Sequence, residues 1–202
     1  MPQSKTLRAT TRKTRPIGRP RSEKTRQVIL KTAFRLLKKH GFDAVSNQQI
    51  SAEAGVSTAT LYRWWKNKEA ILLDSYLETT RQLLPYGKRG APLLRLRNYT
   101  IRIAEVLNSD DGHVFLGLML AIQNNHFLRT AFYENVFLPR RAEGCAVVQE
   151  AIDAGHLPPT VDSDFMINLL IGPQLLPALM GRRLTKDSAK KIFAFVLNAV
   201  LR

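Results

Sequence analysis

The stretch SNQQISAEAGVSTATLYRWW, from Ser46 to Trp65, decides the fold predicted for this chain. Ser46 followed three residues later by Gln49 is a capping-box pattern, which predicts the start of a short helix with Ile50 on its buried side. Gly55 can adopt the positive φ of a tight turn because it has no Cβ atom to clash with the backbone. The pattern therefore predicts a short helix that ends in a tight turn.

A second short helix is expected after this turn, over residues 58–65, with Ser57 as its cap and with Leu61 and Trp65 on its buried side. The other side chains of that helix are left for solvent or DNA: Thr58, Ala59, Thr60, Tyr62, Arg63 and Trp64. Two short helices joined by such a turn form a helix-turn-helix, whose second helix lies in the major groove of DNA. A plain helical hairpin has the same periodicity, so the charge of the chain has to separate the two interpretations.

The positive charge of the chain is concentrated in its first half. The 202 residues carry a net charge of +15, from 31 Lys and Arg against 16 Asp and Glu. Residues 1–90 hold 19 basic and 6 acidic side chains, whereas residues 91–202 hold 12 and 10. A surplus of this size indicates a polyanionic partner, either nucleic acid or an anionic membrane surface. Together with the helix-turn-helix pattern, it favours double-stranded DNA.

The first 21 residues form a basic segment with seven Lys and Arg, no acidic residue and too few apolar side chains to bury a core. Such a composition predicts disorder in isolation. Residues 1–21 are interpreted as an arm that contacts DNA through Arg19 and Arg21, which directly precede the first predicted helix. A tail that only improves solubility is the alternative.

The chain from Ser22 onward shows helical periodicity almost throughout, without the alternation that is typical of strands. Besides the two short helices, seven more are predicted, over residues 22–40, 67–84, 92–108, 111–124, 126–154, 162–181 and 185–201. The predicted fold class is all-α, with about nine helices. A three-helix helix-turn-helix domain is expected at residues 22–68, followed by a ligand-binding and dimerisation domain at residues 69–202.

Several functional classes are excluded by what the sequence lacks. Cys145 is the only cysteine, so no internal disulfide can form, and no Cys or His spacing is typical of a metal site. No apolar run approaches the roughly 20 residues of a membrane span, and no apolar core of a signal peptide follows the N-terminus. The second half of the chain contains neither a nucleophile paired with a base nor a glycine-rich phosphate loop, so nothing in it indicates an enzyme. We expect a cytoplasmic protein that is not an enzyme and has no cofactor.

Residues 22–73 resemble the N-terminal DNA-binding domain of the TetR family of bacterial regulators. The resemblance is carried by ISAEAGVSTATLYRWWKNKEAILL, from Ile50 to Leu73, with its Ala-Gly-Val-Ser turn and its Thr-Leu-Tyr in the second helix. Residues 126–181 resemble one C-terminal subgroup of the same family, through FYENVFLPRR and EAIDAGHLP. The resemblance implies a DNA-binding transcriptional regulator that forms a homodimer and responds to a ligand.

The resemblance also implies particular DNA contacts. They are phosphate or base contacts from Asn47 and Gln48, groove contacts from Thr58, Ala59 and Thr60, and phosphate contacts from Tyr62 and Lys68. Lys68 follows Asn67, the expected cap of a helix, where a cation opposes the helix dipole unless an anion lies nearby. A DNA phosphate would be that anion. Trp64 stands where the family often has a smaller aromatic residue or His, and it either packs on a sugar-phosphate edge or covers the rim of the domain.

The second half of the chain is expected to supply the dimer interface. A helix-turn-helix reads only a few base pairs, so specificity normally requires two half-sites and a two-fold symmetric protein. The last two predicted helices are apolar on more than one stripe, which is more than a single core needs. Residues assigned to the interface are Phe165, Leu169, Leu176, Phe193, Val196 and Val200.

A pocket for a small apolar or aromatic ligand is expected in the same half. Residues assigned to it are Phe115, Met119, Ile122, Phe137 and Val148. Aromatic and Met side chains at helical spacing also occur in plain cores, so these residues have an alternative interpretation.

The sequence thus predicts a sequence-specific DNA-binding transcriptional regulator. It would act as a repressor that a small-molecule ligand releases from a near-palindromic operator. An activator of the same fold is one alternative. The other is an architectural protein that binds DNA without choosing its sequence.

Overall fold

The computed structural model describes residues 22–80 and 83–202, and over these ranges the chain is all-α. The helices in chain order are α1 (Glu23–His40), α2 (Asn47–Ala54), α3 (Thr58–Tyr62), α4 (Lys68–Thr80), α5 (Pro92–Leu107), α6 (Asp110–Asn124), α7 (His126–Phe132), the π-helical turn η1 (Tyr133–Phe137), α8 (Leu138–Asp153), α9 (Ser163–Leu179) and α10 (Lys186–Val200). The predicted fold class is confirmed. The predicted arm, with Arg19 and Arg21, lies outside the described residues.

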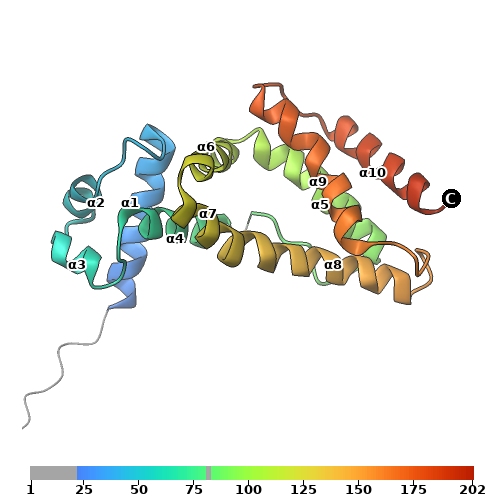
Figure 1. Cartoon of the computed structure of the whole chain (residues 1–202), viewed down its shortest axis with the longest axis horizontal. Helices are drawn as coiled ribbons and strands as arrows, with labels where there is room; N and C mark the ends of the chain where they lie inside the picture. Colours follow the sequence, from blue (N-terminus) through green and yellow to red (C-terminus); the bar gives the residue numbers. More distant parts are fainter. Residues whose placement is uncertain (1–21, 81–82) are drawn as a thin grey trace, which may run out of the picture.

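The molecule is elongated, with the short helices α2 and α3 at one end and α10 at the other (Figure 1). Helices α1 to α4 form the first end, α5, α8, α9 and α10 form the second, and α6 and α7 lie between them. No helix in the described ranges combines the length and the apolarity that crossing a membrane requires.

Helix α1 begins and ends where the sequence predicts. The Ser22 side chain accepts a hydrogen bond from the Thr25 backbone N–H at 3.4 Å, and Gly41 ends the helix with a φ of 77°. Its buried side carries the apolar residues Ile29, Leu30, Ala33, Phe34, Leu36 and Leu37. Helix α1 is therefore the scaffold against which the helix-turn-helix packs.

The capping box at the start of α2 is confirmed. The Ser46 hydroxyl accepts from the Gln49 backbone N–H at 3.2 Å, and the Ser46 N–H donates to Gln49 Oε1 at 2.9 Å. Gly55 ends α2 in the left-handed conformation, with φ 66° and ψ 35°. Ser57 then caps α3 through the Thr60 N–H at 3.2 Å. The local signals of the sequence therefore set both helix ends at this turn.

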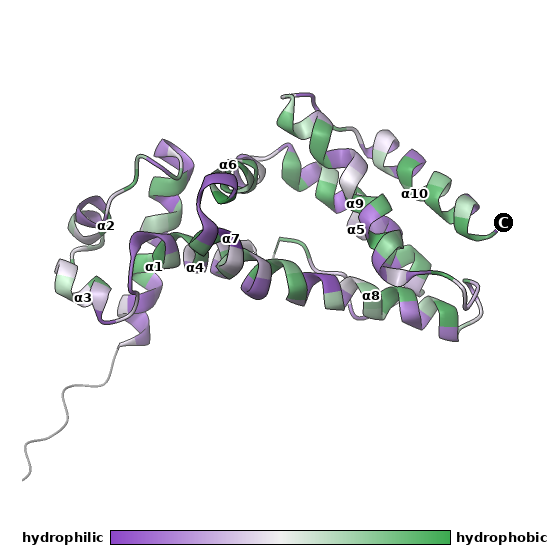
Figure 2. Ribbon diagram, in the orientation of Figure 1, coloured by the Kyte–Doolittle hydropathy of each residue, from purple (hydrophilic) through white to green (hydrophobic). Residues whose placement is uncertain are grey.

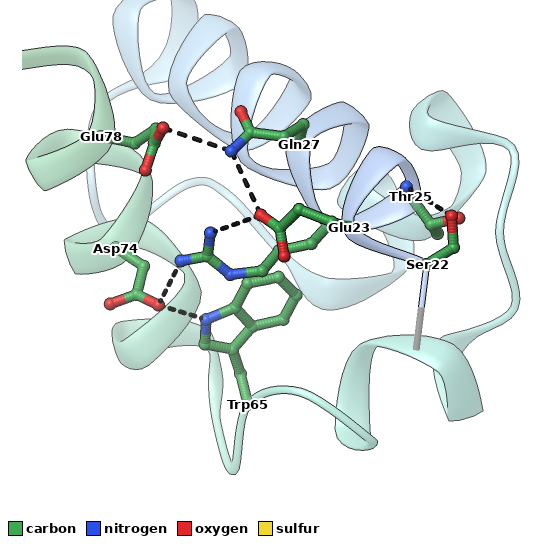
Figure 3. A network of polar contacts seen from close by, with 8 residues as sticks. Ser22, Glu23, Thr25, Gln27, Trp65, Asp74 and Glu78 are labelled. Atoms are coloured by element: carbon green, nitrogen blue, oxygen red, sulfur yellow. Dashed lines mark hydrogen bonds and ion pairs between the residues drawn. The ribbon is translucent and has the colours of Figure 1, made fainter. Parts of the chain in front are cut away.

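Helix α3 is shorter than the predicted helix over residues 58–65, since it ends at Tyr62. The chain turns there, and the buried Trp65 donates through Nε1 to Asp74 Oδ2 of α4 at 2.8 Å. Figure 3 shows the Trp65 indole pointing toward Asp74. The same carboxylate oxygen lies 3.5 Å from Nη2 of Arg26, and Arg26 in turn contacts Glu23 at 3.1 Å. The end of the helix-turn-helix is thus tied to both α1 and α4.

Two hydrophobic cores lie along the molecule. The first joins α1 to α4 with residues from the middle of the chain, namely Val114, Leu118 and Ile122 of α6, Leu128 and Phe132 of α7, and Val136 of η1. The second joins α5, α8, α9 and α10. The helix-turn-helix end therefore shares its core with α6 and α7.

The C-terminal helices follow the prediction closely. The helix expected over residues 126–154 is interrupted only by the π-helical turn η1 between α7 and α8. Helix α9 continues past Pro173 and Pro177. The buried Gln174 side chain lies between these prolines and donates to the carbonyl oxygens of Leu170 at 2.9 Å and Thr100 at 3.2 Å. This amide links α9 to α5 at a point where proline removes backbone donors.

Candidate nucleic-acid interface and apolar cavity

Helices α2 and α3 expose part of the set of side chains that the sequence assigns to DNA. Gln48, Ala59 and Tyr62 are exposed, whereas Thr58 and Thr60 are half-buried. The hydroxyl of Thr60 lies 2.9 Å from that of Ser57, within hydrogen-bond distance. The start of α3 thus presents small side chains, which permit close approach of its backbone to another molecule.

Tyr62 has its ring at the surface and its hydroxyl held in place. Its side chain is 57% exposed, and Asn47 Nδ2 donates to the hydroxyl oxygen at 3.1 Å. The hydroxyl hydrogen of Tyr62 therefore remains available for an acceptor. Asn47 is half-buried, and its Oδ1 has no hydrogen-bond partner within the described ranges. Asn47 positions Tyr62 in this structure.

Lys68 begins α4 beside the loop that joins α1 to α2. Its Nζ donates to the carbonyl oxygens of Phe42 and Asp43, both at 3.4 Å, and lies 5.6 Å from the centre of the Phe42 ring. The Asn67 side chain accepts from the Ala70 N–H at 2.9 Å, so the predicted cap is confirmed. Carbonyl oxygens thus offset the cation at this helix start, and the ammonium keeps a third N–H for an anion.

Of the two basic residues next to α3, Arg63 was left open to solvent or DNA by the sequence, and Lys66 was not assigned to DNA at all. Arg63 and Lys66 are both exposed, directly after the helix. Their position beside the recognition helix was the available signal. Trp64 is half-buried against the first core, with its ring centre 6.0 Å from that of Trp65, so it lies at the rim of the domain.

An apolar cavity of about 200 Å³ lies between the end of α4, helices α5 and α6, the segment from α7 to α8, and α9. Phe115, Met119 and Phe137, three of the five residues assigned to a ligand pocket from the sequence, line it. Ile122 and Val148 do not line it. Ile122 is buried in the first core and Val148 in the second, because each lies on a helix face that packs against neighbouring helices.

Arg140 of α8 brings charge to this cavity. Its Nη1 donates to the Leu84 carbonyl oxygen at 2.5 Å, and its Nη2 donates to that of Thr80 at 2.7 Å. Tyr86 and Tyr99, which also line the cavity, stack with their ring centres 3.6 Å apart. None of these residues is assigned to a pocket from the sequence, because they come from three separate segments with no shared local pattern.

The cavity also contacts the helix-turn-helix end. Asp111 of α6 lines the cavity and forms an ion pair with Lys38, in the last turn of α1, at 2.9 Å. The hydrogen bond to Asp111 and the nearby negative charges raise the pKa of Lys38 above its ordinary value, despite some loss of solvation. This ion pair spans from the cavity wall to the scaffold helix.

Helices α9 and α10 expose large apolar side chains, and apolar residues recur along both of them (Figure 2). The exposed fractions of the largest are 59% for Phe165, 66% for Leu176, 68% for Met180 and 76% for Phe195. Leu169 and Val200 are half-buried. Phe193 and Val196 are only 6% and 3% exposed, because they face the second core of their own protomer. They are not available to a partner.

Neither the single cysteine nor the described His, Cys, Asp and Glu side chains indicate a reactive or metal-binding site. Burial raises the pKa of the Cys145 thiol, which reduces the thiolate form that reacts with oxidants. No group of three His, Cys, Asp or Glu side chains in the described part of the chain could hold a metal ion.

Two family descriptions match the chain. Residues 29–74 match "Bacterial regulatory proteins, tetR family", and residues 93–196 match "Tetracyclin repressor-like, C-terminal domain". The helix-turn-helix-type transcriptional regulator YdeS of Bacillus subtilis strain 168 is 36% identical over 156 residues, which are 77% of this chain and 79% of that protein.

Solved structures show the same fold. The TetR family transcription regulator SCO0332 superimposes with a TM-score of 0.75 at 23% identity, covering 89% of this chain and 100% of that one. The transcriptional regulator FadR of Bacillus subtilis, solved in complex with stearoyl-CoA, has a TM-score of 0.66 at 17% identity and covers 87% and 97%. From these matches and the geometry above, the chain belongs to the TetR family of bacterial regulatory proteins, which are DNA-binding transcriptional regulators rather than enzymes.

Proposed function

We propose that this protein is a homodimeric repressor that binds a near-palindromic operator through α3 and leaves it when a small molecule fills the cavity. The observation that carries the DNA contact is Tyr62, exposed on α3 and held by Asn47 with its hydroxyl hydrogen available. A phosphate oxygen is a strong acceptor for such a donor. Arg63 and Lys66, exposed beside α3, add charge attraction to the DNA backbone.

The exposed apolar surface of α9 and α10 supports the homodimer. Large exposed apolar patches on a protein mark interaction sites, since leaving them in water is unfavourable. Phe165, Leu176 and Phe195 are more than half exposed in the single protomer. A second copy that contributes the same surface would bury them in a two-fold interface.

The cavity supports release by a ligand. It lies beside the end of α4, and α4 packs on α1 of the helix-turn-helix end. A related fold, that of FadR from Bacillus subtilis, is solved with stearoyl-CoA. A ligand that fits only one arrangement of these helices would shift the dimer toward that arrangement and change the spacing of its recognition helices.

A binding titration against DNA tests the regulator function. Selection from random DNA yields an operator, and fluorescence anisotropy then compares it with a scrambled duplex at several salt concentrations. We expect the operator to bind about 1,000-fold more tightly than the scrambled duplex at physiological salt. Equal affinities would instead identify an architectural DNA-binding protein. A reporter gene behind the operator whose expression rises with the protein would identify an activator.

Replacing Tyr62 with phenylalanine tests the phosphate contact. Because a hydrogen bond to a charged acceptor is lost while the ring remains, we expect affinity to fall by about tenfold for operator and scrambled DNA alike. Tyr133→Phe is the matched control, since Tyr133 is 51% exposed on η1, away from α3. Unchanged affinity in Tyr62→Phe, or a loss confined to the operator, would contradict the phosphate assignment.

A further inference from the structure

The size of the cavity limits the molecule that it holds. Its volume is about 200 Å³. A dry cavity of about 150 Å³ in another protein binds benzene. The cavity of this protein therefore has room for one aromatic ring and a small substituent, and a long acyl chain exceeds it.

The walls of the cavity are rich in aromatic rings. Tyr76 and Phe115 stack with ring centres 6.2 Å apart, and Phe115 lies 6.4 Å from Phe132. Tyr86 and Tyr99 form a second stacked pair at another part of the wall. Flat rings pack well against such walls, in stacked or edge-to-face arrangements.

The charges that line the cavity are unequally compensated. Asp111 is paired with Lys38, and Arg141 forms a two-point contact with Asp164, its Nη2 lying 2.7 Å from Oδ2. Arg140 has no acidic partner within the described ranges, and its guanidinium contacts the carbonyl oxygens of Thr80 and Leu84 and the hydroxyl of Tyr99. A guanidinium has five N–H groups, so these three contacts leave some of them for a ligand. The charge left without a counter-charge is therefore positive.

Neutral hydroxyl donors surround the same guanidinium. Burial raises the pKa of Tyr76 to about 12, and burial also raises the pKa values of Tyr86 and Tyr99, although the charge of Arg140 partly opposes each shift. These tyrosines stay protonated at neutral pH. Their hydroxyls already form hydrogen bonds within the wall, Tyr86 with Tyr99 and Tyr76 with Thr80, so they add neutral polar groups and no counter-charge to Arg140.

We propose that the cavity binds a compact aromatic carboxylate, with its ring between the aromatic walls and its carboxylate on the guanidinium of Arg140. An arginine recognises a carboxylate through parallel N–H···O bonds, and an apolar surround strengthens the attraction. A cationic ligand finds no uncompensated acid in the described part of the cavity wall. The assignment rests on the proposed function, because it names the class of ligand for that cavity.

Isothermal titration calorimetry of the full chain without DNA tests the assignment. The probes are benzoate and phenylacetate, their neutral amides benzamide and phenylacetamide, and decanoate. We expect each aromatic acid to bind at least about tenfold more tightly than its amide, since the bond to a charged partner is lost in the amide. Decanoate is expected to bind more weakly than phenylacetate. Amides that match their acids, or decanoate that binds more tightly than both acids, would overturn the assignment.

Variants of Arg140 separate recognition from folding. In Arg140→Gln the preference for acid over amide should disappear, and in Arg140→Lys it should be partly retained. Arg129→Gln, an exposed site on α7, is the control that keeps the preference. A preference that persists in Arg140→Gln overturns the assignment, and if that variant does not fold, the acid and amide comparison in the natural chain still decides. Release of the operator by the ligand is measured in a separate experiment. If the acid binds but the operator is not released, the proposed function is contradicted while the ligand assignment is still supported.

Discussion

Gly112→Ala is expected to lower the free energy of unfolding by about 3 kcal/mol. Gly112 lies in the first turn of α6, where the chain folds back on the end of α5. A Cβ atom there would lie 2.1 Å from the Val106 carbonyl oxygen and 2.6 Å from the Leu107 Cα atom. These are backbone atoms that cannot rotate away, so the two helices would have to separate. Urea denaturation followed by circular dichroism measures the change.

Gly117→Ala in the same helix is the matched control. No atom lies within 4 Å of the position that its Cβ atom would take, and Gly117 is exposed. Alanine favours a helix over glycine, so this variant should be more stable than the natural chain by about 0.5–1 kcal/mol. Equal stabilities of the two variants would show that α5 and α6 do not approach each other as closely as described.

Phe195→Glu is expected to convert the dimer into monomers and to weaken operator binding by about 100-fold or more. Phe195 is 76% exposed on α10, on the surface that we assign to the partner subunit. A carboxylate buried in an apolar interface without a counter-charge is strongly unfavourable. Two linked reading units bind a two-site operator far more tightly than one unit does, by factors of about 100 to 10,000. Light scattering after gel filtration gives the mass, and anisotropy gives the affinity.

The control for this variant is the same substitution at Phe127. That residue is 51% exposed on α7, away from α9 and α10. Phe127→Glu should leave the mass and the DNA affinity of the dimer unchanged. A Phe195→Glu protein that remains dimeric, with a normal helical spectrum, would place the interface elsewhere on the surface.

The helix-turn-helix was predictable because its signals are local. Ser46 with Gln49, and Gly55 after them, act within one turn of helix, and the structure shows the hydrogen bonds and the φ angle that these residues imply. The early end of α3 was not predictable in this way. Beyond Tyr62, the buried Trp65 donates to Asp74, a carboxylate on the next long helix, and no local pattern predicts that contact.

The assignment of helix faces was harder to predict from the sequence. Helix α10 is apolar on both sides, and periodicity alone cannot tell which side faces the protomer's own core. Phe193 and Val196 face inward, whereas Phe195 faces outward. The polar end of the cavity was hidden for a related reason. Arg140 lines the cavity beside the end of α4, which lies about 60 residues earlier in the chain, and no local pattern predicts that contact.

The core that joins α1 to α4 with α6 and α7 has a consequence for engineering. Regulators with new operators are commonly sought by grafting one reading unit onto another sensor. A graft of residues 22–68 would separate Ile29 and Leu61 from Ile71, Leu72 and Leu118, which pack in the same cluster. Such a hybrid should misfold or aggregate unless the apolar contacts of α6 and α7 are transplanted too. The part of this protein that has to be transplanted as a whole is therefore the packed cluster of side chains, which come from separate segments of the sequence.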